Sequence, residues 1–162
     1  MKNHLLNILE RDAALSIDEL SVRLNSTPEE VRQAMSELVA ERKIIAYKAI
    51  LPESASKGPQ VQAIIEVKVT PRRENGFDAT ARRIARFPEV TDLCLVSGGF
   101  DLLVTVSGNS LQEVAAFVSE RLATIEGVIS TTTTFQLKKY KESGRLLEEV
   151  ESTERLAVCP YF

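Results

Sequence analysis

Two helix-start motifs stand eleven residues apart near the N-terminus, and they constrain the fold more than any other feature of the sequence. Ser16-x-x-Glu19 has the form of a capping box, in which a hydroxyl and a carboxylate bind each other's unpaired backbone N–H groups at the start of a helix. Thr27-Pro28-x-Glu30 repeats this form and adds proline at the first helical position, where an N–H is not needed. The sequence therefore predicts two successive helices, joined by a tight turn at Asn25-Ser26.

Apolar residues at helical spacing extend this pair to three helices, the first over residues 3–12. The apolar stripes are Leu5, Ile8 and Leu9 in the first helix, Leu20 and Leu24 in the second, and Val31, Met35 and Leu38 in the third. Three helices with a tight turn between the last two predict a helix-turn-helix. A generic helical bundle with solvated polar faces is the alternative that composition alone leaves open.

The next two segments predict the end of this domain. Residues 44–51 are mostly apolar and predict a short strand after the third helix. Proline, serine and glycine then cluster over residues 52–60, which predicts a linker between two periodic segments. We therefore predict a helix-turn-helix domain over residues 1–51 and a linker over residues 52–60.

Beyond the linker, the periodicity predicts strand, helix, strand, strand, helix and strand in that order. The predicted strands are 61–69, 90–96, 102–106 and 128–137, and the helices are 77–87 and a segment from Ser110 to Gly127. We expect the paired glycines of Ser97-Gly98-Gly99-Phe100-Asp101 to permit a tight reversal between the middle strands. This order predicts a ferredoxin-like βαββαβ sandwich over residues 61–141, and the fold class is α+β.

Two further expectations concern assembly. Because helices would cover one sheet face and the other would also carry apolar side chains, we expect a dimer or a higher oligomer. The tail, residues 142–162, ends in an apolar run over 156–162 that we expect to pack on the body or on a neighbouring subunit.

Composition excludes several classes of protein. The chain of 162 residues is 44% hydrophobic and 27% charged, as in ordinary globular proteins. It has no apolar run of the ~18 residues that a membrane span needs, so we expect no membrane partner and a cytoplasmic location. Cys94 and Cys159 are too few for a zinc cage, and we expect no disulfide, metal or cofactor.

Several motifs spread over residues 5–147 resemble those of the Lrp/AsnC (feast/famine) regulators. Residues 15–20, the spacing from Val31 to Leu38, and Ile45-Ala46-Tyr47 stand where that family has its helix-turn-helix and exit strand. Gly98-Gly99-Phe100-Asp101 resembles the family's reversal between the middle strands, and residues 127–133 resemble its entry into the last strand. Each motif is weak alone, whereas their order and spacing are specific.

The resemblance implies a DNA-binding domain tethered to a ligand-sensing domain, with dimers assembled into rings such as an octamer. It also implies an amino-acid effector held by Gly98, Gly99, Asp101, Thr131 and Thr133. A carboxylate can pair with an α-ammonium group, while hydroxyls and exposed backbone amides can bind an α-carboxylate. The alternative is that the glycines only form a turn, Asp101 caps it, and the threonines are ordinary strand formers.

Polar residues off the apolar stripe of the third helix are candidates for contact with the major groove of double-stranded DNA. They are Glu29, Arg32, Gln33 and Ser36. Arg32 and Gln33 are preferred as base contacts, because Arg favours guanine and Gln favours adenine. Thr27, Lys43 and Lys48 are the candidates for phosphate contact. Merely solvated side chains are the alternative for each of them.

One departure from the family weakens the expected hold on phosphate. The family tends to carry basic residues in the second half of this helix, where the sequence has Ala34, Ser36 and Glu37. Residues 1–51 contain seven Lys or Arg and eight Asp or Glu, a net charge of −1, and the whole chain carries −3. Avidity among several DNA-binding domains could compensate.

Two rival functions remain open. Some proteins of this layout decarboxylate a modified tetrapyrrole with a histidine of the sensor domain, but the sole histidine here is His4, and no catalytic triad or phosphate loop occurs. We therefore expect that this protein is not an enzyme. The second rival is an adaptor that has lost DNA binding and acts in mixed oligomers, for which the acidic third helix is the evidence.

Overall fold

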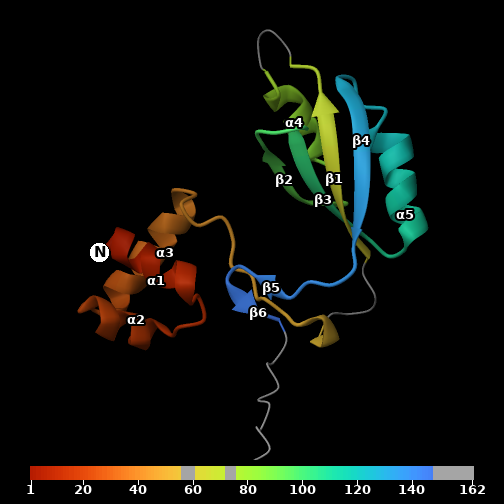
Figure 1. The fold of residues 1–162 in the computed structure, drawn as a ribbon. Helices are drawn as coiled ribbons and strands as arrows, with labels where there is room; N and C mark the ends of the chain where they lie inside the picture. The colour runs from red at the N-terminus through yellow and green to blue at the C-terminus, as the bar shows by residue number, and fades with distance from the viewer. Residues whose placement is uncertain (56–60, 72–75, 148–162) are drawn as a thin grey trace, which may run out of the picture. The chain divides into compact units, whose positions relative to one another are not determined.

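The chain forms two compact units, divided between Ile50 and Leu51 (Figure 1). The structure is a computed structural model, and it describes residues 1–55, 61–71 and 76–147. Most of the expected linker, residues 56–60, and most of the expected tail, residues 148–162, lie outside the described residues, as does the apolar end of that tail. Residues Glu53–Ala55 form a single 3₁₀ turn, η1.

The N-terminal unit contains three helices: α1 (Lys2–Arg11), α2 (Ile17–Leu24) and α3 (Pro28–Ala40). The predicted apolar stripes contribute the buried core residues Leu5, Leu9, Leu20, Val31 and Leu38, and the core also contains Ala34, which was not predicted to be part of it. Ala34 therefore packs inside, so its apolar character in α3 does not weaken a DNA contact.

Both capping boxes form as predicted. Ser16 Oγ accepts from Glu19 N at 3.2 Å, and Ser16 N donates to Glu19 Oε2 at 2.8 Å. Thr27 and Glu30 make the equivalent pair at 3.3 and 2.8 Å. Between the helices Asn25 has a φ of 49°, a left-handed conformation that Asn tolerates better than most residues. These local bonds fix where α2 and α3 begin.

The strand expected over residues 44–51 does not form, since these residues pair with no strand of the described chain. Ile45 is 77% exposed and Tyr47 is 49% exposed, whereas Ile44 packs against the helical core. Strand-forming composition is insufficient when no neighbouring strand supplies hydrogen bonds.

The C-terminal unit is built on an antiparallel sheet with the strand order β2-β3-β1-β4. The strands are β1 (Val61–Val69), β2 (Val90–Leu95), β3 (Leu102–Gly108) and β4 (Val128–Gln136). Helix α4 (Asp78–Ile84) follows β1, and α5 (Leu111–Ala116) follows β3 and continues as a π-helical segment, η2 (Phe117–Leu122). This arrangement confirms the α+β class.

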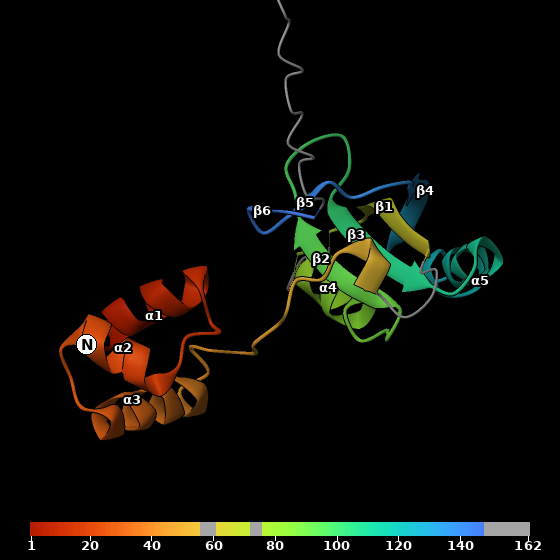
Figure 2. The ribbon, with the colours of Figure 1, turned by 90° about the horizontal axis from the view of Figure 1, so that it is seen from below.

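Both helical segments cover the same face of this sheet, since their residues share one buried cluster with alternate residues of β1 and β3 (Figure 2). The strand members are Ala63, Ile65, Val67, Val69, Leu102, Val104 and Val106, and the helical and loop members are Ile84, Val114, Phe117, Leu122 and Ile125. Fully burying an aliphatic side chain contributes about 1.5–3 kcal/mol, so this face provides most of the unit's cohesion.

The opposite face of the sheet is more polar than we expected. Ile64 and Leu103 are half-buried there, but their neighbours on β1 include the exposed Glu66 and Lys68. Across β2 and β3, Asp92 pairs with Thr105 and Cys94 with Leu103. The uncovered face therefore carries some apolar side chains, as predicted, but charged and hydroxylated residues stand between them.

A short hairpin after the sheet was not predicted. It joins β5 (Lys141–Glu142) to β6 (Arg145–Leu146), and Ser143 and Gly144 lie between them with φ of 45° and 81°. Positive φ at both central positions matches a type I′ turn, for which Ser-Gly is a weaker signal than Asn-Gly.

Within the described chain, no helix combines the length and apolarity that crossing a bilayer requires.

Candidate functional sites

Helix α3 presents a polar face on the side opposite the core. Arg32, Gln33 and Ser36 are exposed, while Val31 and Leu38 are fully buried on the other side. The capping box and Pro28 fix the start of the helix, and therefore which residues face outward. The predicted base contacts thus share one accessible surface, and they are dispensable for the core.

Each of the two preferred base contacts is bound to a carboxylate of the same helix. Arg32 Nη1 lies 3.1 Å from Glu29 Oε2, and Gln33 Nε2 donates to Glu37 Oε1 at 3.0 Å. These partners stand three and four residues away, the separations at which helical side chains meet. Ser36 is exposed beside them.

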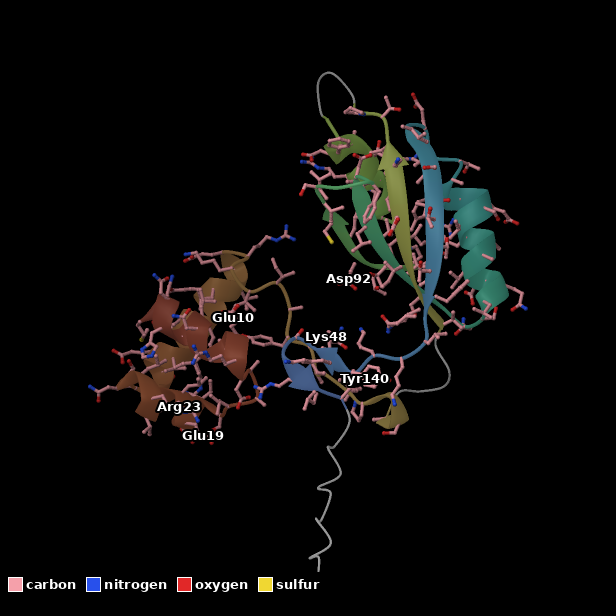
Figure 3. All side chains as sticks on the ribbon, viewed as in Figure 1. Glu10, Glu19, Arg23, Lys48, Asp92 and Tyr140 are labelled. Carbon is pink, nitrogen blue, oxygen red and sulfur yellow. The ribbon has the colours of Figure 1, made fainter. Side chains whose placement is uncertain are left out.

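The candidates for phosphate contact differ in their surroundings. Thr27 uses its hydroxyl oxygen as the cap acceptor, and hydrogen bonds from its backbone and then from its side chain lower the pKa of Glu30. Lys43, just after α3, lies 2.7 Å from Glu41 Oε2. Lys48 is exposed in the segment that was expected to be a strand, and Figure 3 labels it.

A residue that sequence reasoning missed, Lys2 of α1, connects these groups. Lys2 Nζ lies 2.7 Å from both Glu37 Oε2 and Glu41 Oε1. Gln33, Glu37, Lys2, Glu41 and Lys43 therefore form one continuous network on the surface of the N-terminal unit. The helical spacing of Gln33 and Glu37 signals their contact, but nothing local signals that of Lys2, which is 39 residues from Glu41.

This network shifts the acidity of its members. Hydrogen bonds from Lys2 and then from Lys43 lower the pKa of Glu41 from 4.5 to about 2. The pKa of Glu37 is also lowered, mainly by Lys2 and then by Gln33, and the pKa of Lys2 is raised above 10.5 by both carboxylates. The carboxylates are therefore ionised at neutral pH and compete for nearby donors.

In the C-terminal unit, Asp101 joins two strands. Its Oδ2 accepts a hydrogen bond from Val69 N at 2.9 Å, and its own backbone N donates to Val67 O at 3.1 Å. Its carbonyl accepts from Val96 N at 2.9 Å, which closes the reversal. Asp101 thus ties β1 to the start of β3, and the carboxylate retains Oδ1 for another partner.

The two glycines of the reversal are not required by the chain itself. Neither Gly98 nor Gly99 has a positive φ, and a Cβ built on either would meet nothing within 4 Å. The expected reversal forms, closed by Val96 N and Asp101 O, but it does not depend on the conformational freedom of these glycines. Gly127 contrasts with them, because its φ is 96° and its Cβ would lie 3.3 Å from Thr80 Oγ1.

The strand register places Thr131 and the reversal at the same end of β1. Val67 pairs with Leu102 on one side and with Thr131 on the other, so Asp101 and Thr131 flank the same end of β1. Thr133 pairs with Ile65, about 7 Å further along the strand at ~3.4 Å per residue. Both threonines are half-buried on the face that carries the core, whereas Thr132 and Thr134 are exposed on the other face.

The comparisons with known proteins match this architecture of a helical unit followed by a sheet unit. Residues 62–146 match the family model of the Lrp/AsnC ligand binding domain. The chain is 39% identical over 160 residues to YugG, an uncharacterized HTH-type transcriptional regulator of Bacillus subtilis, covering 98% of this chain and 96% of that protein.

Two solved structures agree with this similarity. The transcriptional regulator NMB0573 from Neisseria meningitidis, crystallised as a complex with L-Met, is 28% identical with a TM-score of 0.63, covering 87% of this chain and 90% of the other. E. coli AsnC shares the fold at 18% identity with a TM-score of 0.65, covering 87% and 93% of the two chains.

The fold and these matches define a transcriptional regulator with a ligand-binding domain. The chain belongs to the Lrp/AsnC family. The relatives that it matches are named as transcriptional regulators and not as enzymes.

Proposed function

We propose that this protein regulates transcription by binding double-stranded DNA with α2 and α3, used as a helix-turn-helix. The observation that carries the proposal is the exposed polar face of α3, on which Arg32, Gln33 and Ser36 project away from a well-packed core. A helix of this size fits the major groove, where Arg can bind guanine and Gln can bind adenine. Thr27, Lys43 and Lys48 are the proposed phosphate contacts.

We further propose that the C-terminal unit is a ferredoxin-like sensor for an amino acid. The complex of NMB0573 with L-Met supports this ligand class, since it comes from a regulator of the same architecture. The proposed contacts are Gly98, Gly99, Asp101, Thr131 and Thr133. Asp101 Oδ1 can pair with an α-ammonium group, and the open space at the two glycines gives a ligand access to backbone amides.

We also propose that the protein is cytoplasmic and that it acts as a dimer or as a higher oligomer such as an octamer. Ile64 and Leu103 on the uncovered sheet face offer a limited apolar contact, and the polar residues around them can pair across a subunit interface. Several DNA-binding units in one assembly would raise the avidity for DNA.

A gel-shift titration of the purified protein with a duplex from the upstream region of its own gene tests the proposal. We expect retardation of this duplex at lower protein concentrations than of a scrambled duplex, and a change of the midpoint on addition of the effector. Failure to retard either duplex in low salt contradicts the proposal. It would favour an adaptor that acts through mixed oligomers, which the carboxylates bound to Arg32, Gln33 and Lys43 also support.

A further inference from the structure

Three of the donors that α3 and its exit offer to DNA already bind carboxylates of the same unit. Arg32 binds Glu29, Gln33 binds Glu37, and Lys43 binds Glu41, all at 2.7–3.1 Å. A donor in such a pair must leave its carboxylate before it can contact a phosphate or a base. The internal pairs therefore oppose DNA binding at this surface.

Two of these carboxylates stand at an electrostatically unfavourable place. Glu37 and Glu41 lie at the C-terminal end of α3, where the helix carries partial negative charge, and the last turn contains no basic residue. Lys2, from α1, offsets both charges at 2.7 Å. The helix alone does not favour the two carboxylates, and the capping box of Thr27 and Glu30 lies at its other end.

We propose that Glu37 and Glu41 compete with DNA for Lys2, Gln33 and Lys43, and that they hold the affinity of a single N-terminal unit for DNA low. This inference rests on the proposed function, because it concerns the regulation of the same α3 surface. The carboxylates compete with the phosphate backbone of a duplex, and also with the base edges that Gln33 can reach. Stable occupancy then requires several units on one duplex, so assembly controls DNA binding.

The same pairs limit the salt dependence of binding. A lysine that is neutralised by a carboxylate of its own unit does not neutralise a phosphate, and it releases no counterion from the DNA. Removal of the carboxylate adds about one phosphate contact, which steepens the slope of log K against log[salt] by about 0.9.

The experiment uses the full chain as wild type, as Glu37→Gln, as Glu41→Gln and as the double variant. Fluorescence anisotropy with the upstream duplex and a scrambled duplex gives the affinity over a series of salt concentrations. Glu10→Gln is the matched control, because it makes the same change of net charge at an exposed residue of α1, Glu10, which Figure 3 labels. Circular dichroism checks that each variant keeps its helices.

We expect each replacement, at Glu37 or at Glu41, to tighten binding to both duplexes roughly two- to fivefold, the range that exposed ion pairs provide. The salt slope should steepen as well, and Glu10→Gln should change neither quantity. If the wild type binds and the double variant binds no tighter, or if Glu10→Gln has the same effect, the inference is wrong and the proposed function stands. If neither the wild type nor any variant binds, the proposed function fails and the inference fails with it.

Discussion

The two units of this protein are stabilised over different distances along the chain. In the N-terminal unit, capping bonds join residues three apart, and the core is formed by helices that follow one another closely. In the C-terminal unit, β1 lies between β3 and β4, so Ile65 pairs with both Val104 and Thr133. The first kind of structure is encoded locally, whereas the second depends on segments that meet only after folding.

The prediction with the largest expected effect tests whether the two units are independently stable. Leu38 is fully buried in the helical core, so Leu38→Ala should destabilise the N-terminal unit by about 2–5 kcal/mol. Hydrogen exchange followed by mass spectrometry should show faster exchange in α1–α3 and unchanged protection in β1, β3 and β4. Val39→Ala is the control, since Val39 is 49% exposed on the same helix. Lost protection in the sheet would contradict the independence of the units.

A second prediction separates structure from ligand binding at Asp101. Asp101→Ala leaves Val69 N without its acceptor and should cost about 1–3 kcal/mol, whereas Asp101→Asn keeps an acceptor oxygen and should cost less. Both variants lack the negative charge that would pair with an α-ammonium group, so both should lose amino-acid binding. Calorimetry with L-methionine and then with the other amino acids measures this loss. Unchanged binding to the Asn variant would make Asp101 a structural residue only.

A third prediction compares base and phosphate contacts on the N-terminal unit. Arg32→Ala should weaken binding to the upstream duplex by about 1–3 kcal/mol and affect a scrambled duplex less. In the Glu41→Gln protein, where Lys43 is released from its carboxylate, Lys43→Ala should weaken binding to both duplexes and make the salt slope shallower by about 0.9. Equal losses on both duplexes for Arg32→Ala would indicate a phosphate contact, and no loss for either variant would favour the adaptor.

The sequence predicted best the features that local chemistry determines. The capping boxes at Ser16 and Thr27, the strand at Val61–Val69 and the helix start at Ser110 all agree with the structure. The strand over residues 44–51 was predicted from a suitable composition, but among the described residues no neighbouring strand pairs with it. The polar character of the uncovered sheet face was missed for a related reason, since the face that a residue occupies depends on the strand register.

The candidate sites also contain some features that local spacing determines and others that depend on packing. Helical spacing was sufficient to place Arg32, Gln33 and Ser36 on one exposed face of α3. It could not show that Lys2 reaches Glu37 and Glu41, because that contact depends on how α1 packs against α3. Nor could it show that one oxygen of Asp101 is already bound to Val69 N.

The smallest expected effect is a pH dependence confined to the N-terminal unit. The pKa of Glu41 falls from 4.5 to about 2 in the folded chain, chiefly through Lys2, and the pKa of Glu37 is lowered too. Lowered carboxylate pKa values stabilise the folded state above pH ~4.5, and this stabilisation is lost as the pH falls from there towards 2. Because the pKa of Lys2 is raised, its contribution is complete below pH 10.5 and is lost at higher pH.

Lys2→Met should therefore make the N-terminal unit less stable near neutral pH and less sensitive to acid. The loss of stability on acidification should become smaller but not disappear, because the capping bonds also lower the pKa values of Glu19 and Glu30. Thermal unfolding followed by helical circular dichroism between about pH 3 and pH 7 measures the difference, which added salt should reduce. Lys68→Met makes the same charge change at an exposed residue of β1 and should leave the acid dependence as in the wild type. Equal acid sensitivity of the Lys2→Met protein and the wild type would show that Lys2 does not hold these carboxylates in solution.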